Sequence, residues 1–155
     1  MCKEKYMRKA IDLSIENIDK GGGPFGAVIV KDGVVISAKA NSVTNDNDPT
    51  AHAEVNAIRA AAKKLGTFDL SGCVIFSSCE PCPMCLGAIY WARIDHLYFA
   101  NTKKDADDIG FSDNFIYEEL DKHYSHRNLK TDTMMREEAL EAFNKWRDNE
   151  AKTEY

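Results

Sequence analysis

The segment that most restricts the fold of this chain lies between residues 51 and 101, where helical and extended patterns alternate. An alanine-rich helix over about Ala51–Leu65, closed by Gly66, is followed by a short apolar strand over Cys73–Ser78. A helix over Cys82–Ala92 and a strand over Asp95–Ala100 come next. Strands that alternate with helices are typical of an α/β fold, in which helices cover both faces of one sheet.

The first forty residues add a helix and a hairpin to this alternation. Apolar residues recur at helical spacing over residues 3–20, which indicates an amphipathic helix. Two apolar runs, Ala27–Val30 and Val34–Ala38, flank an Asp-Gly dipeptide at Asp32 and Gly33. Because Asp-Gly is a strong signal for a tight turn, we predict a β-hairpin here.

A glycine-rich stretch, Gly21–Gly26, lies between that helix and the first strand. It lacks the Lys-Ser/Thr ending of a phosphate loop, and it precedes a strand rather than following one. Two interpretations remain open. The stretch either stops the helix, or lets the backbone approach a ligand closely and presents Phe25 to it.

The remaining segments are polar or charged. The run Asn101–Gly110 has no apolar period and indicates a loop or hinge, and Asn41–Asp48 indicates a polar loop. Helices are expected over Asn114–Asp121 and Arg136–Arg147. A length of 155 residues without an internal repeat or a linker predicts a single domain spanning residues 1–155.

Charge and cysteine content exclude several classes of protein. The net charge of −5 comes entirely from residues 101–155, which hold 9 basic and 14 acidic side chains, so a generic nucleic-acid binder is not expected. No stretch reaches the roughly 20 apolar residues that cross a bilayer, and residues 1–20 lack a signal-peptide pattern. An odd number of cysteines, 5, favours metal or thiol chemistry in a reducing cytoplasm over a disulfide framework.

Two expected helices begin with metal-binding residue types. His52-Ala53-Glu54 opens one, and Pro81-Cys82-Pro83-Met84-Cys85 opens the other, a spacing shared by zinc nucleobase deaminases. Cys82 and Cys85 are three residues apart, so both sulfurs lie on one helical face, and the helix N-terminus favours their thiolates. With His52 they provide three ligands to one Zn²⁺ per chain and leave a fourth position for water, as in catalytic zinc sites.

Glu54 is the expected catalytic acid and base. Zinc lowers the pKa of a bound water to about 7, which makes a nucleophile available at neutral pH. In the first turn of a helix Glu54 can reach that water rather than the metal. It would take a proton from the water and deliver protons to a ring nitrogen and a departing amine.

Cys79 leaves a rival interpretation open. The spacing of Cys79, Cys82 and Cys85 resembles that of closed zinc or iron–sulfur sites. A fourth thiolate would saturate the metal, and the site would then be structural. Cys-x-x-Cys can also be a redox pair, so a closed zinc module or a redox module without turnover is the alternative from another class.

The chain resembles the cytidine deaminase superfamily and, within it, the bacterial guanine deaminases of the short zinc-dependent type. The metal motif carries the resemblance to the superfamily, and the stretches near the C-terminus narrow it. The resembling stretches are Gly22–Gly33, Asn47–Val55, Ser78–Arg93, Gly110–Tyr117 and Lys152–Tyr155.

This resemblance implies a three-layer α/β/α sandwich around a mixed five-stranded sheet, and a homodimer. In similar guanine deaminases the C-terminal segment, here about residues 101–155, is exchanged between subunits. The run Asn101–Gly110 would then serve as the hinge, since exchange through hinge loops is a low-cost route to dimers.

The resemblance also implies the reaction and the substrate residues. The expected reaction is the hydrolysis of guanine, a small purine base, to xanthine and ammonia, with attack at C2. Phe25 and Trp91 would offer flat apolar surfaces to the ring, and Asn41 would donate to and accept from the base edge. Asp113 would accept from N–H groups, and Tyr155 would close the pocket, in cis or from the partner chain.

Two other deaminase functions remain open. A tRNA adenosine deaminase shares the metal motif, but it must bind an anticodon loop, and an acidic 101–155 segment would repel RNA. A deaminase acting on another small base or nucleoside, such as guanosine or cytosine, is the second.

Overall fold

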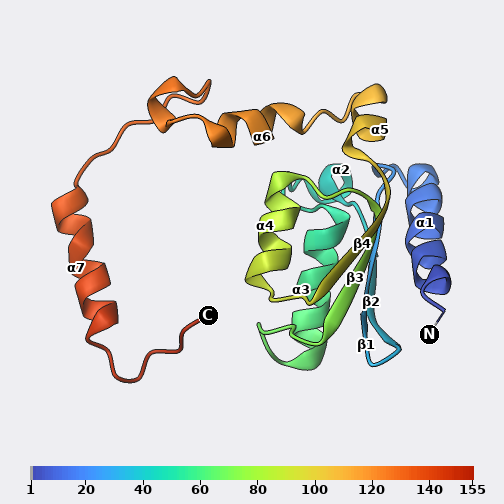
Figure 1. Cartoon of the computed structure of the whole chain (residues 1–155), viewed down its shortest axis with the longest axis horizontal. Coiled ribbons are helices and arrows are strands. Elements are labelled where there is room, and N and C mark those ends of the chain that lie inside the picture. The colour runs from blue at the N-terminus through green and yellow to red at the C-terminus, as the bar shows by residue number, and fades with distance from the viewer. Residues whose placement is uncertain (1) are drawn as a thin grey trace. The chain divides into compact units, whose positions relative to one another are not determined.

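The computed structural model describes residues 2–155, which divide into two compact units, the first ending at Asn114 and the second spanning Phe115–Tyr155. The first unit contains one sheet with helices on both faces (Figure 1). Its elements in chain order are α1 (Glu4–Asp19), β1 (Gly26–Lys31), β2 (Val34–Ala40), α2 (Val43–Asp46), α3 (Ala53–Leu65), β3 (Cys73–Cys79), α4 (Pro83–Trp91), β4 (His96–Asn101) and α5 (Lys103–Asp108).

The sheet is mixed and has the strand order β2-β1-β3-β4. Strand β1 runs antiparallel to both β2 and β3, whereas β3 and β4 are parallel and joined through α4. Parallel neighbours need such a helical crossover, as the alternation of patterns predicted. The α/β sandwich is confirmed, but the expected count of five strands is wrong for the described residues, which form 4.

The stretch that was expected to be a loop or hinge contains a helix. Asn101–Gly110 is not the loop that its charges indicated, because Lys103–Asp108 forms helix α5. The Thr102 side chain accepts from the Asp105 N–H, and the Asp105 carboxylate accepts from the Thr102 N–H, which is a complete capping box. This local signal stabilises a helix directly after β4.

The predicted hairpin is present between β1 and β2. Its turn residues Asp32 and Gly33 both have positive φ angles, 49° and 78°. A two-residue turn of this kind matches the right-handed twist of the strands, and Asp-Gly tolerates it. The segment Asn41–Asp48, which was also predicted to be a loop, contains the short helix α2.

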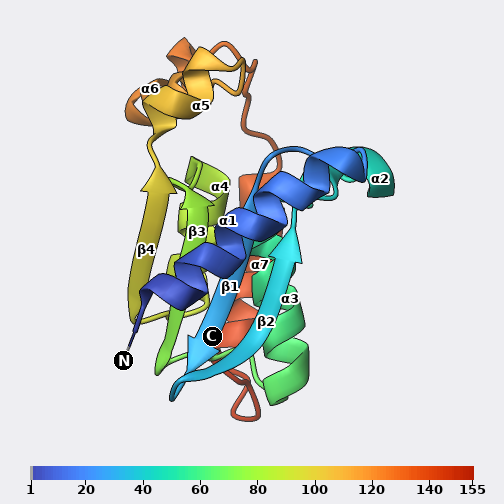
Figure 2. The ribbon, with the colours of Figure 1, turned by 90° about the vertical axis from the view of Figure 1, so that its right-hand side faces the viewer.

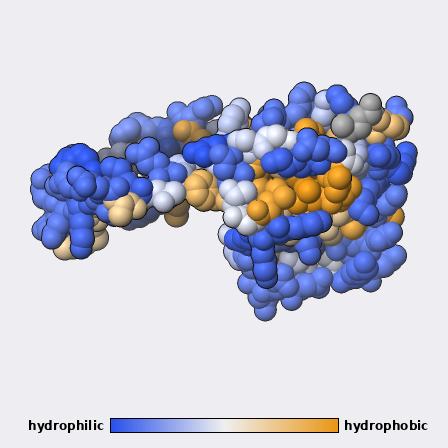
Figure 3. All heavy atoms as spheres, turned by 90° about the horizontal axis from the view of Figure 1, so that it is seen from below, coloured by the Kyte–Doolittle hydropathy of each residue, from blue (hydrophilic) through white to orange (hydrophobic). Residues whose placement is uncertain are grey.

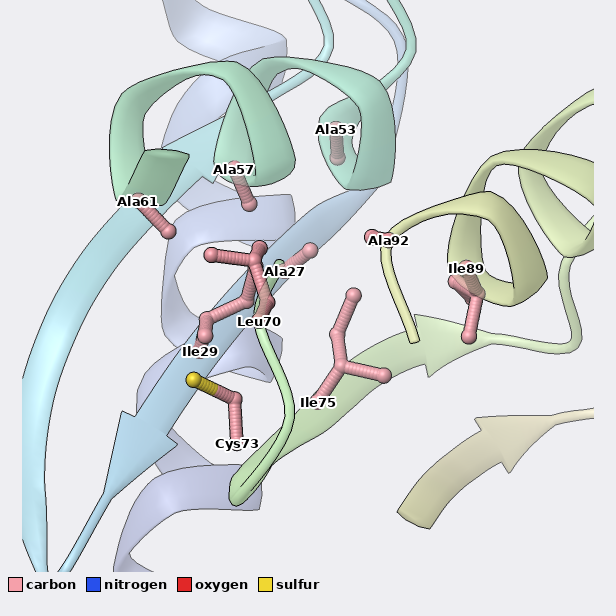
Figure 4. Packing of buried hydrophobic residues seen from close by; sticks show 10 residues of the cluster. All are labelled: Ala27, Ile29, Ala53, Ala57, Ala61, Leu70, Cys73, Ile75, Ile89 and Ala92. Carbon is pink, nitrogen blue, oxygen red and sulfur yellow. The ribbon is translucent and has the colours of Figure 1, made fainter. Parts of the chain in front are cut away.

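Alternate residues of β1 point to opposite faces of the sheet and enter two separate cores. On one face Val28 and Val30 pack with Tyr6 and Ala10 of α1, which crosses the sheet (Figure 2). On the other face Ala27 and Ile29 face α3 and α4. Figure 4 shows this second core, whose members are Ala27, Ile29, Ala53, Ala57, Ala61, Leu70, Cys73, Ile75, Ile89 and Ala92. A strand buried on both faces reads as an unbroken apolar run, as the sequence of β1 does.

The second unit contains helix α6 (Asn114–Asp121, which begins one residue before the unit), a 3₁₀ helix at Tyr124–His126 and helix α7 (Arg136–Arg147). The expected helices of this region are therefore present. None of the residues 115–155 is buried within this single chain. Across the described residues, no helix is both long and apolar enough to cross a membrane.

Candidate metal centre and active site

Helices α3 and α4 bring the three expected zinc ligands together at their N-termini. His52 is the N-cap residue of α3, Cys82 is the N-cap residue of α4, and Cys85 lies in the first turn of α4. The distance from His52 Nδ1 is 3.5 Å to Cys82 Sγ and 3.4 Å to Cys85 Sγ. One ligand atom from each residue lies within 4.8 Å of the other two, so this group could hold a metal ion.

The local sequence explains how the two sulfurs converge. Pro83 occupies the first turn of α4, where a missing N–H costs no hydrogen bond and a fixed φ favours the helix. The Cys82 Sγ accepts from the Cys85 N–H at 3.5 Å and thereby caps the helix. Partial positive charge at this helix end favours an anion on the cap residue.

The electrostatics of the pair favour a bound cation. The hydrogen bond with the Cys85 thiol is the largest of the causes that lower the pKa of Cys82 to about 4, and a hydrogen bond with His52 is another. The same hydrogen bond, together with burial, raises the pKa of Cys85. A hydrogen bond with Cys82 also raises the pKa of His52. A second thiolate at this distance therefore needs a positive charge, and two sulfurs with one imidazole nitrogen are a donor set that Zn²⁺ prefers.

Glu54 lies beside this group but is not part of it. Its side chain is 5% exposed, and burial raises the pKa of its carboxyl group. The hydroxyl of Ser77 on β3 donates to Glu54 Oε1 at 2.8 Å. A buried carboxyl group with a raised pKa is suited to take and return protons near neutral pH.

Cys79 lies outside the group of possible metal ligands, so the closed four-ligand site is not favoured. It is buried, and its thiol faces the Thr102 carbonyl oxygen at 3.7 Å. Burial is the main cause that raises the pKa of Cys79, to about 11. A thiol of this kind stays protonated and behaves as a small apolar residue.

Asp113 has the one buried side-chain oxygen or nitrogen atom without a hydrogen-bond partner in the part of the chain that the structure describes. This atom is Oδ1. Burial, followed by the negative charge of Cys82, raises the pKa of Asp113. An orphaned acceptor costs free energy unless a ligand supplies a donor, so the atom marks a place for a ligand N–H.

Phe25 and Asn41 are held next to each other by backbone contacts. The Asn41 N–H donates to the Phe25 carbonyl, and the Asn41 Oδ1 accepts from the Val43 N–H. The Phe25 ring packs edge-on against Phe111 at 5.0 Å between centroids. The contact with Val43 fixes the orientation of the Asn41 side-chain amide.

Asn17 of α1 fixes the glycine-rich stretch. Its buried Nδ2 donates to the carbonyl oxygens of Gly23 and Asn41, at 2.7 and 2.8 Å. A β-carbon at Gly22 would overlap this amide group, which explains why glycine is needed there. The stretch therefore stops the helix and also positions Phe25 and Asn41.

The other two expected substrate residues are largely exposed in the single chain. Trp91, at the last position of α4 and so at the opposite end of that helix from Cys82, is 70% exposed. Tyr155 belongs to the second unit and is 72% exposed. Their assignment to the substrate site stays a prediction from the resemblance.

Sequence reasoning missed Ser77 and Asn17. A signal existed for both, because each is a polar residue on the buried side of an amphipathic or apolar pattern. Ser77 follows four residues of a buried strand, and Asn17 continues the buried face of the first helix. Buried polar side chains need a partner, and in both cases the partner belongs to the candidate site.

Comparisons with known proteins agree with this geometry. The family model for the cytidine and deoxycytidylate deaminase zinc-binding region matches residues 1–101. Guanine deaminase of Bacillus subtilis is 49% identical over 156 residues, which cover 100% of both chains. A tRNA-specific adenosine deaminase of Aquifex aeolicus is 41% identical over 104 residues, 67% of this chain and 69% of the relative.

A comparison of the structure with solved structures also indicates a guanine deaminase relative. The crystal structure of the Bacillus subtilis guanine deaminase has a TM-score of 0.97 with this chain and covers 100% of it and 99% of its own length. The match to the family model includes the histidine, the glutamate and both cysteines of the site described above. The chain therefore belongs to the cytidine and deoxycytidylate deaminase family and carries the family's zinc-binding region.

Proposed function

We propose that this protein is a guanine deaminase, which hydrolyses guanine to xanthine and ammonia. The observation that carries the proposal is the extent of similarity: the Bacillus subtilis guanine deaminase matches the whole chain, including residues 102–155 beyond the family model. The tRNA-specific relative matches two thirds of the chain. In the net reaction the oxygen of water bonds to C2 of guanine, the bond from C2 to the exocyclic nitrogen breaks, and ammonia leaves.

One zinc ion per chain fits the site. His52, Cys82 and Cys85 would hold it, since their donor atoms already face one another and Glu54 and Cys79 stand outside the group. When bound, zinc lowers the pKa of a water ligand and stabilises negative charge on oxygen.

Glu54 moves the protons in this proposal. Its buried carboxylate takes a proton at a side-chain oxygen, donates it to a nitrogen of the purine ring, and delivers a second proton to the departing amine. Burial supports this role because it brings the pKa of the carboxyl group up toward the working pH.

The substrate would be bound by groups that complement guanine. Asp113 Oδ1 is a buried acceptor without a partner, and guanine offers N–H donors on its ring and its amine. The Asn41 amide can donate to a ring nitrogen or carbonyl oxygen, and Phe25 offers a flat face. Trp91 and Tyr155 complete the proposed set, on the strength of the resemblance.

The proposal includes a homodimer. Residues 1–155 form one functional domain, and its C-terminal segment, about 101–155, is exchanged between the two subunits. Large apolar side chains of the second unit are exposed in the single chain, among them Leu129, Phe143 and Trp146. Figure 3 shows a hydrophobic area on the first unit as well. Exposed apolar surfaces of this extent favour association, and a second copy supplies both surfaces.

Co-expression of two inactive variants tests the exchange. Glu54→Gln removes the proton carrier, and Tyr155→Ala removes the tail residue. If the tail acts in trans, a mixed dimer holds one complete site, and random pairing restores about one quarter of the wild-type activity. A tail that acts in cis restores no activity. The same two variants, purified separately and then mixed, control for slow exchange of subunits between dimers.

The reaction itself is tested with purified protein. Ammonia release and the loss of guanine absorbance are measured for guanine, guanosine, adenine, cytosine and a tRNA anticodon stem–loop, with zinc per chain measured on the same sample. We expect turnover of guanine and one zinc per chain. Turnover of the RNA, or of another base in preference to guanine, would assign the site to one of the two other deaminase functions.

A reducing, cytoplasmic compartment is part of the proposal. All 5 cysteines are free, and two of them are needed as thiolates for the metal.

A further inference from the structure

Ser77 lies in the interior of β3, where its hydroxyl contacts two acceptors that belong to different parts of the site. Its Oγ is 2.8 Å from Glu54 Oε1 and 2.7 Å from the carbonyl oxygen of Cys79. The side chain is 1% exposed, so water does not compete for these contacts. Ser77 therefore links the proton carrier on α3 to the end of the strand that leads to the two cysteine ligands.

A serine hydroxyl has one proton, so it can donate to one of these two acceptors at a time. The Ser77 hydroxyl donates its proton to the Glu54 carboxylate when that group is ionised. The contact with the Cys79 carbonyl fixes the Ser77 oxygen on the strand, and the contact with Glu54 fixes the carboxylate relative to that oxygen.

In the described part of the chain, Ser77 is the side chain whose hydrogen bond to the Glu54 carboxylate the geometry shows. A cysteine that binds a metal gives up its proton, so Cys85 offers no donor to Glu54 once a metal is bound.

We propose that Ser77 is a positioning residue, which holds the Glu54 carboxylate at the angle needed for proton transfer through the hydrogen bond that its hydroxyl donates. The inference rests on the proposed deaminase function. Partners of this kind fix the orientation of catalytic groups, and their loss lowers turnover more than substrate binding.

A pair of variants isolates the hydroxyl. Ser77→Thr and Ser77→Val place side chains of nearly the same shape and volume in the buried site. They differ in that threonine keeps the hydroxyl where valine has a methyl group. In the zinc-loaded, full-length protein we expect Ser77→Thr to keep kcat within about threefold of wild type, and Ser77→Val to lower it about tenfold to a hundredfold. The KM of both variants should stay within about threefold of the wild-type value, because neither changes a group assigned to the substrate.

Zinc per chain gives a readout that does not depend on turnover and should agree between the Thr and Val variants. The thermal midpoint checks that both variants are folded at the assay temperature, and Ser77→Val should unfold at the lower temperature because it leaves buried acceptors without a donor. Equal kcat values for the two variants, or loss of zinc in Ser77→Val alone, would overturn the proposal. If the added methyl prevents folding, Ser77→Ala replaces the pair. Its control is Ser37→Ala, which removes another buried serine that donates to α3, at the Ala57 carbonyl, without touching Glu54.

Failure of the proposed function gives a different result. If wild type deaminates another base instead of guanine, the same variants are compared on that base, and the expected ratio is unchanged. A wild-type protein inert toward every base removes the proton transfer that Ser77 would assist, and this outcome overturns both proposals.

Discussion

The two compact units of this chain differ in what stabilises them. In the first unit β1 is buried on both faces, between α1 on one side and α3 with α4 on the other. In the second unit no residue is buried, and apolar side chains such as Phe143 are exposed within the single chain. The metal group and Glu54 lie in the unit that has its own core, whereas the second unit has no buried core within the single chain.

The largest effect on activity should come from removing the proton-carrying group of the first unit without disturbing its core. Glu54→Gln keeps the size of the side chain and removes its ability to carry a proton. We expect kcat to fall about a hundredfold to ten-thousandfold, while zinc per chain and the thermal midpoint stay close to wild type. Steady-state ammonia release with metal analysis measures this, and near-normal kcat would remove Glu54 from the mechanism.

A core substitution tests whether the first unit is stabilised by its own packing. Ile29 is fully buried between β1 and the helices, so Ile29→Ala should lower the free energy of unfolding by about 2–5 kcal/mol. Denaturant unfolding followed by circular dichroism measures the change. Val34→Ala, at an exposed position of the same sheet, is the control and should change the free energy by less than about 0.5 kcal/mol.

The matching substitution in the second unit tests whether its apolar side chains are covered in solution. Phe143 is 74% exposed in the single chain, and a solvated phenylalanine contributes little to stability. If a second copy covers it, Phe143→Ala should cost about 1–3 kcal/mol and shift the dimer toward monomer in light scattering. A change within about 0.5 kcal/mol, with no change in mass, would contradict the exchanged dimer.

The smallest effect is expected at Cys79. Because its thiol is protonated and faces the Thr102 carbonyl, Cys79→Ser should leave zinc at one ion per chain and kcat within about threefold of wild type. Metal analysis decides the outcome. Loss of zinc from this variant would make Cys79 a ligand and the site a closed one.

Much of the first unit could be predicted from local sequence, because its signals are local. The hairpin follows from the positive φ angles that Asp32 and Gly33 tolerate, and the metal group follows from residues that begin two helices. Helix α5 was wrongly expected to be a loop. Its capping residues Thr102 and Asp105 are a readable helix signal, but the run around them is charged and has no apolar periodicity that would indicate a helix.

The rest of the candidate site depends on contacts between distant segments. Ser77 and Glu54 are 23 residues apart, and Asn17 and Asn41 are 24 residues apart. No spacing rule links such pairs, since their contact is created by the sheet and the helices that pack on it. The buried, partnerless oxygen of Asp113 is likewise a property of the folded chain.

The ligand group spans the starts of two separate helices rather than one continuous segment. Because the ligands come from both helices, a movement that separates α3 from α4 would break the group and weaken its hold on a bound cation. The rate at which a chelator removes the ion would therefore depend on local opening between these two helices, and it can be measured without any substrate.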